Sequence, residues 1–173
     1  IYLLLNKMSN SEFGKSPTKY PSLYNPTPTM MDKWEDYIKD KETKWIVEEK
    51  IHGANCGIHY NNGETRFASR NNWIPYTDNF HGLSRNDKML RSKIVKLADL
   101  MGVLDGYVIV YGEICGNVYP KKSRGDRCEP VYSYKGDKDR YGQVQKGVYY
   151  SPHIEFVAFD ICILNGDKQT YLP

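Results

Sequence analysis

A lysine between an apolar run and a glycine is the first feature of this chain that could do chemistry. Residues 45–47 are Trp, Ile and Val. Lys50 follows two glutamates, and Gly53 lies three residues after Lys50. Gly53 lets the backbone turn and approach a ligand closely. A confined lysine can lose its proton and attack an electrophilic phosphorus or carbonyl group. Lys50 is therefore a candidate nucleophile, and the alternative for so short a motif is a solvated strand end.

A lysine attacks only as the free amine, and ordinary lysines are almost entirely charged at neutral pH. The surroundings of Lys50 therefore have to favour the free amine, through desolvation or nearby positive charge. The apolar run predicts a strand over residues 45–50. On such a strand Glu48 shares the side of Lys50, and Glu49 points to the opposite face.

Polar residues also mark later strands. Alternation predicts a hairpin of two strands, over residues 54–60 and 65–70, joined at Asn61-Asn62-Gly63 and ending at Arg70. Glu113 interrupts an apolar strand over residues 107–115. Because buried carboxylates are rare unless they are paired or bind a ligand, Glu113 is a candidate binding residue. The guanidinium of Arg70 suits bidentate phosphate binding, and a surface arginine is the alternative.

Taken in order, these segments resemble the covalent nucleotidyltransferases, in particular the RNA ligase branch with the second phage-type RNA ligase and the kinetoplastid RNA-editing ligases. Residues 49–55 have every specified position of that branch's Glu-Lys-x-His-Gly-x-Asn motif. DNA ligases and mRNA capping enzymes more often have Asp at the position of His52. The resemblance spans roughly residues 19–163, with a gap in its middle, and is carried further by the runs 19–25, 66–70, 111–116 and 155–161.

The resemblance implies an activity and a set of site residues. ATP, with Mg²⁺ or Mn²⁺, would transfer AMP to Lys50, and RNA 5′-phosphate and 3′-hydroxyl ends would then be joined. Nucleotide contacts are implied for Glu49, Ile51, Asn55, Arg70, Glu113 and Phe159. Asn55 would contact the ribose or a phosphate. Glu113 would bind a ribose hydroxyl or, alternatively, a divalent cation.

The residues themselves leave some of these roles open. His52 either fixes the turn before Gly53, acts as a general acid or base, or contacts a phosphate. Strand alternation does not by itself place Glu49 at the adenine edge. The resemblance implies that Phe159 stacks on the adenine, but an apolar strand over residues 154–164 does not distinguish Phe159 from Phe156.

The expected fold is α+β, mainly antiparallel sheet with flanking helices. Asp32-Lys33-Trp34-Glu35 resembles a capping box and predicts a helix to about Asp40. A second helix is predicted from Asp87 to Met101, with Gly102 ending it. The resemblance implies an ATP-grasp-like nucleotidyltransferase (adenylation) domain of two packed sheets with the nucleotide between them. It is expected to be C-terminally incomplete, because the family's later Glu-Gly-x-Val and Lys-x-Lys motifs are absent from this chain. The missing C-terminal segment of the same ligase is therefore an expected partner.

We expect an extended N-terminal segment over residues 1–30 and the adenylation domain over residues 31–173. Within that domain, residues 117–150 form a basic, tyrosine-rich insertion. It has eight Lys or Arg and four Asp or Glu, a net charge of +4 that exceeds the +3 of the whole chain. Basic and aromatic side chains together suit RNA binding, and a flexible solvated insertion is the alternative. The RNA-binding candidates are Lys121, Lys122, Arg124 and Arg127.

Composition sets broader limits. With 173 residues, 40% of them hydrophobic and 26% charged, the chain is large enough for one globular domain. The four cysteines form no CxxC pair, so we expect no zinc site and an intracellular, reducing compartment. The apolar run Tyr2–Leu5 is too short to span a membrane, and Ile1 indicates a start at Met8 or a fragment. The alternative functions are a non-catalytic RNA- or nucleotide-binding remnant, and a DNA ligase or capping guanylyltransferase.

Overall fold

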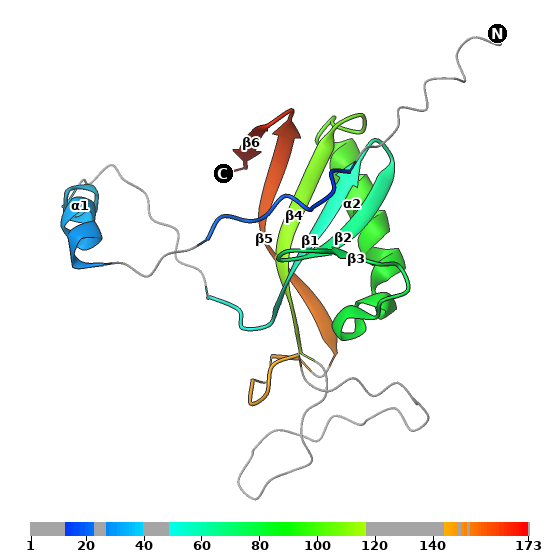
Figure 1. The fold of residues 1–173 in the computed structure, drawn as a ribbon, viewed down its shortest axis with the longest axis horizontal. Helices are drawn as coiled ribbons and strands as arrows, with labels where there is room; N and C mark the ends of the chain where they lie inside the picture. The colour runs from blue at the N-terminus through cyan, green and yellow to red at the C-terminus, as the bar shows by residue number, and fades with distance from the viewer. Residues whose placement is uncertain are drawn as a thin grey trace, which may run out of the picture. The chain divides into compact units, whose positions relative to one another are not determined.

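The computed structural model describes residues 13–22, 27–39, 49–116, 144–148, 150–151 and 153–172. The chain divides into two compact units. We call Tyr20–Lys50 the helix unit, and Ile1–Lys19 together with Ile51–Pro173 the sheet unit. Figure 1 shows the secondary structure of both.

The helix unit contains α1, which runs over Pro28–Lys39. The helix was expected to begin at Asp32, but it begins one turn earlier, where the Met31 amide donates to the Thr27 carbonyl at 2.9 Å. Proline suits the first turn of a helix because its missing N–H would have no helical partner there. Of the strand expected over residues 45–50, positions 45–48 lie outside the described residues, and Glu49 and Lys50 are not in a strand.

The sheet unit is built on six antiparallel strands in the order β3-β2-β1-β4-β5-β6. Their bounds are β1 Ala54–Asn61, β2 Glu64–Ser69, β3 Trp73–Ile74, β4 Tyr107–Gly116, β5 Ile154–Asn165 and β6 Lys168–Tyr171. The expected α+β, mainly antiparallel architecture is confirmed. The described strands make a single sheet, so the second sheet implied by the resemblance is not seen among them.

Local sequence signals are confirmed at the hairpin and at the long helix. Asn62 and Gly63 join β1 to β2 with φ values of 46° and 87°, as a turn with two left-handed residues requires. Helix α2 runs over Asp87–Leu100 and is followed by Gly102. Between β2 and α2, residues 71–86 contain β3 and a 3₁₀ helix over Phe80–Arg85, elements too short to give a periodic pattern.

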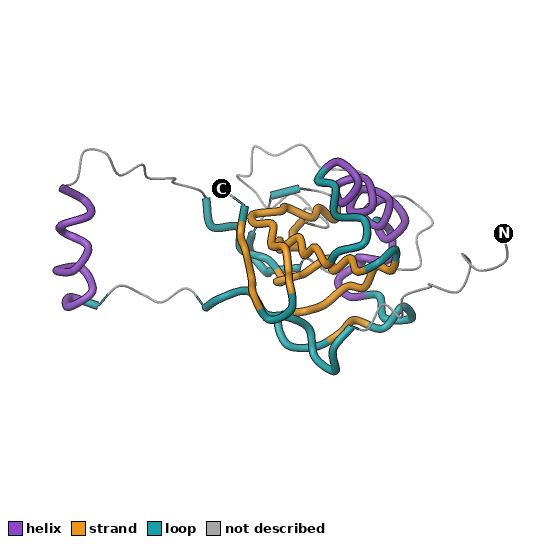
Figure 2. Tube along the Cα trace, turned by 90° about the horizontal axis from the view of Figure 1, so that it is seen from above, coloured by secondary structure: helices purple, strands orange, loops and turns teal. Residues whose placement is uncertain are grey.

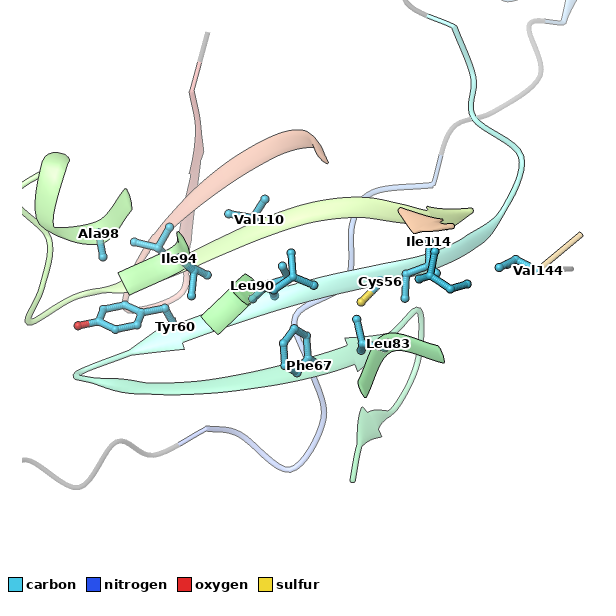
Figure 3. Close-up of a cluster of buried hydrophobic side chains, with 13 residues drawn as sticks. Cys56, Tyr60, Phe67, Leu83, Leu90, Ile94, Ala98, Val110, Ile114 and Val144 are labelled. Atoms are coloured by element: carbon cyan, nitrogen blue, oxygen red, sulfur yellow. The ribbon is translucent and has the colours of Figure 1, made fainter. Parts of the chain in front are cut away.

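Helix α2 covers one face of the sheet, called here the α2 face (Figures 1 and 2). Its buried residues Leu90, Ile94 and Ala98 pack against the apolar side chains of the strands (Figure 3). The other members of this core are Cys56, Ile58, Tyr60, Phe67, Leu83, Val108, Val110, Ile114, Val144 and Ile154. The core thus fixes β1 and β4 side by side, the two strands that matter most for the site.

Residues 13–19, called here the strap, lie across the opposite face, the strap face, in front of β4 in Figure 1. The Phe13 ring meets the rings of Trp73 and Tyr107 edge-on, with centroids 5.4 and 5.5 Å apart. The hydroxyl of Tyr111 donates to the Thr18 carbonyl at 3.1 Å. The strap contains neither helix nor strand.

His59 is buried in the strap face, with 1% of its surface exposed. Its Nδ1 atom lies 3.0 Å from the Tyr107 hydroxyl, and its ring meets Trp73 edge-on at 4.8 Å. Burial lowers the pKa of His59 to about 3. A histidine in this setting is a neutral packing residue at neutral pH.

Cys56, Cys115 and Cys162 are buried in β1, β4 and β5 as free thiols, as expected for small hydrophobic side chains. Burial, with a smaller contribution from the charge of Glu113, raises the pKa of Cys56 to about 12. The fourth cysteine, Cys128, lies outside the described residues. No helix in the described part of the chain is long and apolar enough to cross a membrane.

Candidate functional site

The site begins where β1 and β4 pair. Asn55 and Glu113 are direct register partners across the two strands. Side chains alternate along a strand, so both belong to the same face as His59 and Tyr111, which is the strap face. Two residues that the sequence analysis singled out separately are thereby neighbours in the sheet.

The glycine turn before β1 lies directly against β4. The Gly53 amide donates to Oε1 of Glu113 at 3.2 Å. A Cβ atom added to Gly53 would lie 2.1 Å from the Ile114 carbonyl oxygen. Real Cβ atoms do not approach backbone so closely, so this position accepts only glycine unless the turn moves. Gly53 is required for close approach to the chain itself.

Two further side chains hold the same turn. Nε2 of Gln145 donates to the Gly53 carbonyl at 2.8 Å, and the His52 amide donates to the Tyr150 hydroxyl at 3.1 Å. Sequence reasoning missed both residues, because they lie within residues 117–150, a stretch without periodicity that the sequence predicts to be an insertion. His52 helps to fix the turn through its backbone amide, in line with the first of the roles left open for it.

Residue Val144 anchors the segment that supplies these side chains. Its side chain is buried in the core beside β4, and its amide donates to the Gly116 carbonyl at 3.3 Å (Figure 3). Gly116 has a φ of +89°, and a Cβ atom there would lie 2.1 Å from the His153 carbonyl oxygen. Because Gly116 has no side chain, the backbone at His153 can pack against the end of β4, next to the glycine turn.

A β-bulge decides the placement of Phe159. Ala158 pairs with Gly112 and Asp160 pairs with Tyr111, so Phe159 is the extra residue between the two pairs. Val157, two residues before Phe159, is opposite Glu113 on the strap face. Counted from Val157, Phe159 belongs to that face, and its ring, with 37% of its surface exposed, does not pack against the core of the α2 face.

Phe156, by contrast, packs against the core on the α2 face. Its ring lies so close to Gly112 that a Cβ atom added there would be 2.4 Å from it. The structure therefore separates the two phenylalanines that the sequence pattern left equivalent. Phe159 is the one that belongs to the face carrying Asn55 and Glu113.

Arg70 follows directly after the last residue of β2 and is exposed. Ser69 is the register partner of Cys56, which follows Asn55 in β1. Arg70 therefore lies at the same end of the sheet as Asn55 and the glycine turn.

Three of the remaining predicted site residues precede β1. Glu49 and Lys50 are exposed residues of the helix unit, and Lys50 is covalently followed by Ile51 of the sheet unit. Ile51 is half-buried. The RNA-binding candidates Lys121, Lys122, Arg124 and Arg127 lie outside the described residues.

The described residues contain no group of three or more His, Cys, Asp or Glu side chains that could hold a metal ion. A cavity of about 150 Å³ is present on the α2 face, between β2, β3 and α2. Its lining includes Phe67, Ile74 and Arg91, and it does not include the glycine turn.

Residues 43–173 match the protein-family model described as RNA ligase. The chain is 30% identical over 128 residues to the mitochondrial RNA-editing ligase 2 of Trypanosoma brucei brucei, which covers 69% of this chain and 30% of that protein. For the mitochondrial RNA-editing ligase 1 of the same organism the identity is 29% over 131 residues, 68% of this chain and 28% of the relative. A probable DNA ligase of Dictyoglomus turgidum is 26% identical over 143 residues, 83% of this chain and 21% of that protein. The chain thus spans less than a third of the length of these curated relatives.

Proposed function

This chain belongs to the RNA ligase family, and we propose that the protein carrying it is an ATP-dependent ligase joining RNA 5′-phosphate and 3′-hydroxyl ends. We further propose that the sheet unit is part of a nucleotidyltransferase adenylation domain, with its nucleotide on the strap face. The RNA-editing ligases among its relatives support RNA as the substrate.

In the proposed reaction the neutral amine of Lys50 attacks the α-phosphorus of ATP. A nitrogen–phosphorus bond forms, the bond from that phosphorus to the bridging oxygen breaks, pyrophosphate leaves, and the amine gives up a proton to solvent. AMP then passes from Lys50 to an RNA 5′-phosphate. An RNA 3′-hydroxyl finally displaces AMP and forms the phosphodiester. Charge builds on phosphoryl oxygens throughout, so positioning and electrostatic stabilisation carry the catalysis.

The observation that carries this proposal is the contact between Gly53 and Glu113. The turn that follows the candidate nucleophile is fixed against the strand that bears the candidate nucleotide-binding carboxylate. Asn55 is the register partner of that carboxylate. Residues with separate roles in the resemblance thus converge at one end of one sheet, which is what positioning of a phosphoryl-transfer reaction requires.

The other site residues have roles that their places in the fold support. Phe159 would stack on the adenine from the strap face, since its ring is partly exposed there. Asn55 would contact the ribose or a phosphate, and Arg70 a phosphate. Glu49 and Ile51, on either side of Lys50 in the sequence, would contact the nucleotide next to the nucleophile.

A divalent cation, Mg²⁺ or Mn²⁺, would neutralise charge on the phosphates when bound. Mg²⁺ is commonly held by substrate phosphates and one or two carboxylates, and it needs no cage of protein ligands. A site with Glu113 as its carboxylate fits that pattern, and Glu113 would otherwise bind a ribose hydroxyl. RNA itself would contact the basic insertion, through Lys121, Lys122, Arg124 and Arg127.

Covalent labelling with radioactive nucleotides tests the function. The protein that carries this chain, with the later motifs of the family, should become labelled by α-³²P-ATP and not by α-³²P-GTP, on a denaturing gel. Lys50→Ala and Lys50→Arg should both abolish the label with the fold retained, since arginine keeps its proton and cannot act as the nucleophile. Equal labelling of wild type and variants would exclude Lys50, labelling by GTP would indicate a capping activity, and no label would indicate a non-catalytic binding protein.

A DNA ligase is the second candidate, and the 26% identity to a probable DNA ligase favours it. Sealing assays with nicked duplexes distinguish the two functions. A ligase of RNA should require ribonucleotides at the nick, whereas a DNA ligase should seal an all-DNA nick equally well.

A further inference from the structure

The backbone between Ile51 and Gly53 is held by three side chains from two distant parts of the chain. Glu113 of β4 accepts from the Gly53 amide, Tyr150 accepts from the His52 amide, and Gln145 donates to the Gly53 carbonyl. The peptide groups on both sides of Gly53 are therefore bound. Such bonds restrain rotation of a turn that a glycine would otherwise leave free.

We propose that Gln145 and Tyr150 are positioning residues for the transfer of AMP to Lys50, an inference that rests on the proposed function. Neither is among the residues proposed to touch the nucleotide. Each would act through the backbone of the turn that follows Lys50, holding the nucleophile in line with the α-phosphorus. Misplacement of a reacting group by about 1 Å can cost roughly 100-fold in rate.

The segment bearing the two residues is itself fixed in place. Val144 is buried with 9% of its surface exposed and bonds to the end of β4. Because Gly116 has no side chain, the backbone at His153 can pack closely against that end of β4. Gln145 directly follows the buried Val144, so its amide reaches the turn from an anchored backbone. The half-buried setting of the Gln145 bond also limits its replacement by water.

The two side chains can be tested with substitutions that remove one hydrogen-bonding group and keep the shape. Tyr150→Phe removes only the hydroxyl, and Gln145→Met keeps the length of the side chain without its amide. Matched controls are Tyr76→Phe, at a tyrosine that is 82% exposed, and Gln169→Met, at an exposed glutamine of β6. Both controls lie outside the turn and the segment that holds it.

The catalytic readout is lysyl-AMP formation in a single turnover at saturating ATP. The rate constant reports the placement of the nucleophile, and the amplitude reports the fraction of folded, competent protein. We expect each variant to be about threefold to tenfold slower and the double variant slower still, as loss of hydrogen bonds of ordinary strength predicts. The amplitude and the KM for ATP should stay within about twofold of the wild type, and the controls should match it.

A second readout needs no catalysis. Amide hydrogen exchange of peptides covering residues 50–55, without nucleotide, should speed up in Tyr150→Phe and Gln145→Met and stay unchanged in the controls. Unchanged exchange in the double variant would overturn the proposal that Gln145 and Tyr150 hold the turn. Faster exchange with an unchanged rate constant of lysyl-AMP formation would overturn their role in positioning Lys50.

The proposed function fails in a different way. If the protein that carries this chain, with the later motifs of the family, forms no lysyl-AMP, the ligase assignment is overturned and, with it, the catalytic role of the two residues. A fall in amplitude alone, with the rate constant preserved, would reduce both residues to structural ones.

Discussion

The Gly53 amide donates a hydrogen bond to the Glu113 carboxylate across 3.2 Å, joining residues that are 60 positions apart in the chain. Glu113 therefore has a structural partner as well as its proposed ligand. The contact explains why a carboxylate interrupts the apolar strand β4 and why a glycine stands before β1. A substitution at either residue should therefore alter the conformation of the other.

Replacing Gly53 by alanine should disrupt the turn. The added Cβ atom would lie 2.1 Å from the Ile114 carbonyl oxygen, so the turn has to move away from β4. We expect lysyl-AMP formation to fall at least tenfold and the free energy of unfolding to fall by about 2 kcal/mol. Nucleotide labelling and urea denaturation measure the two effects.

Gly63→Asn is the matched control for that substitution. Gly63 also has a positive φ, but a Cβ atom there would meet nothing within 4 Å, and asparagine tolerates such a turn. Labelling of this variant should equal the wild type. If Gly53→Ala also behaved like the wild type, the close approach of the turn to β4 would be wrong.

The two phenylalanines of β5 should separate stability from nucleotide binding. Phe159→Ala should weaken ATP binding about tenfold, as removal of one base-stacking ring predicts, and change the free energy of unfolding by less than about 1 kcal/mol. Phe156→Ala should cost about 2 kcal/mol of stability, because that ring packs in the core. Calorimetric titration and urea denaturation measure these quantities. The reverse pattern would assign the stacking role to Phe156.

His59 should make stability depend on pH on the acid side. Burial lowers its pKa from the ordinary 6.5 to about 3 in the folded protein, so between these pH values only the unfolded state binds the proton. The free energy of unfolding should therefore fall as the pH is lowered from about 6.5 toward 3, by an amount on the order of a few kcal/mol. Above pH 7 this contribution is fully present.

Urea denaturation of the wild type and His59→Gln across pH 4–8 measures the effect. The variant should lose less stability than the wild type below pH 6.5, and the difference between the two proteins should be constant from pH 7 to 8. If the His59 resonance titrates near pH 6 in an NMR experiment on the folded protein, assigned by comparison with His59→Gln, the buried, neutral state is contradicted.

The basic insertion should matter for RNA and not for ATP. Replacing Lys121, Lys122, Arg124 and Arg127 by serine should weaken RNA binding and flatten its salt dependence, by about 0.7 in the log–log slope for each RNA phosphate that is no longer neutralised. Labelling by ATP should be unchanged. Replacement of three exposed lysines of α2, Lys88, Lys93 and Lys96, is the control. A change of slope in proportion to the four and three charges removed would make the effect one of overall charge.

Much of the sheet unit follows from local sequence. Strict alternation predicted β1 and its hairpin partner, the apolar runs predicted β4 and β5, and a one-sided apolar pattern predicted α2. These signals are local because side-chain direction repeats every two residues in a strand and every 3.6 residues in a helix. The motif order likewise identified the family, because the spacing of residues 49–55 needs no tertiary information. The division into residues 1–30 and 31–173, and the limits of the insertion, stay predictions.

The incorrect predictions concern the start of α1 and the end of the strand expected before Gly53, where local signals of similar strength compete. The capping signal at Asp32 placed the start of α1 too late, since a proline one turn earlier opens a helix equally well and capping contributes only about 1 kcal/mol. The strand expected to end at Lys50 does not include its last two residues.

By itself, the sequence determined the antiparallel α+β architecture of the sheet unit and its membership in the RNA ligase family. Only the tertiary structure decided that Asn55 faces Glu113, that Phe159 and not Phe156 lies on the strap face, and that Gln145 and Tyr150 hold the glycine turn. The physical reason is that these relationships depend on strand register, on one bulge and on hydrogen bonds between distant residues. None of these leaves a periodic pattern in the chain, since each is set by the packing of elements against one another.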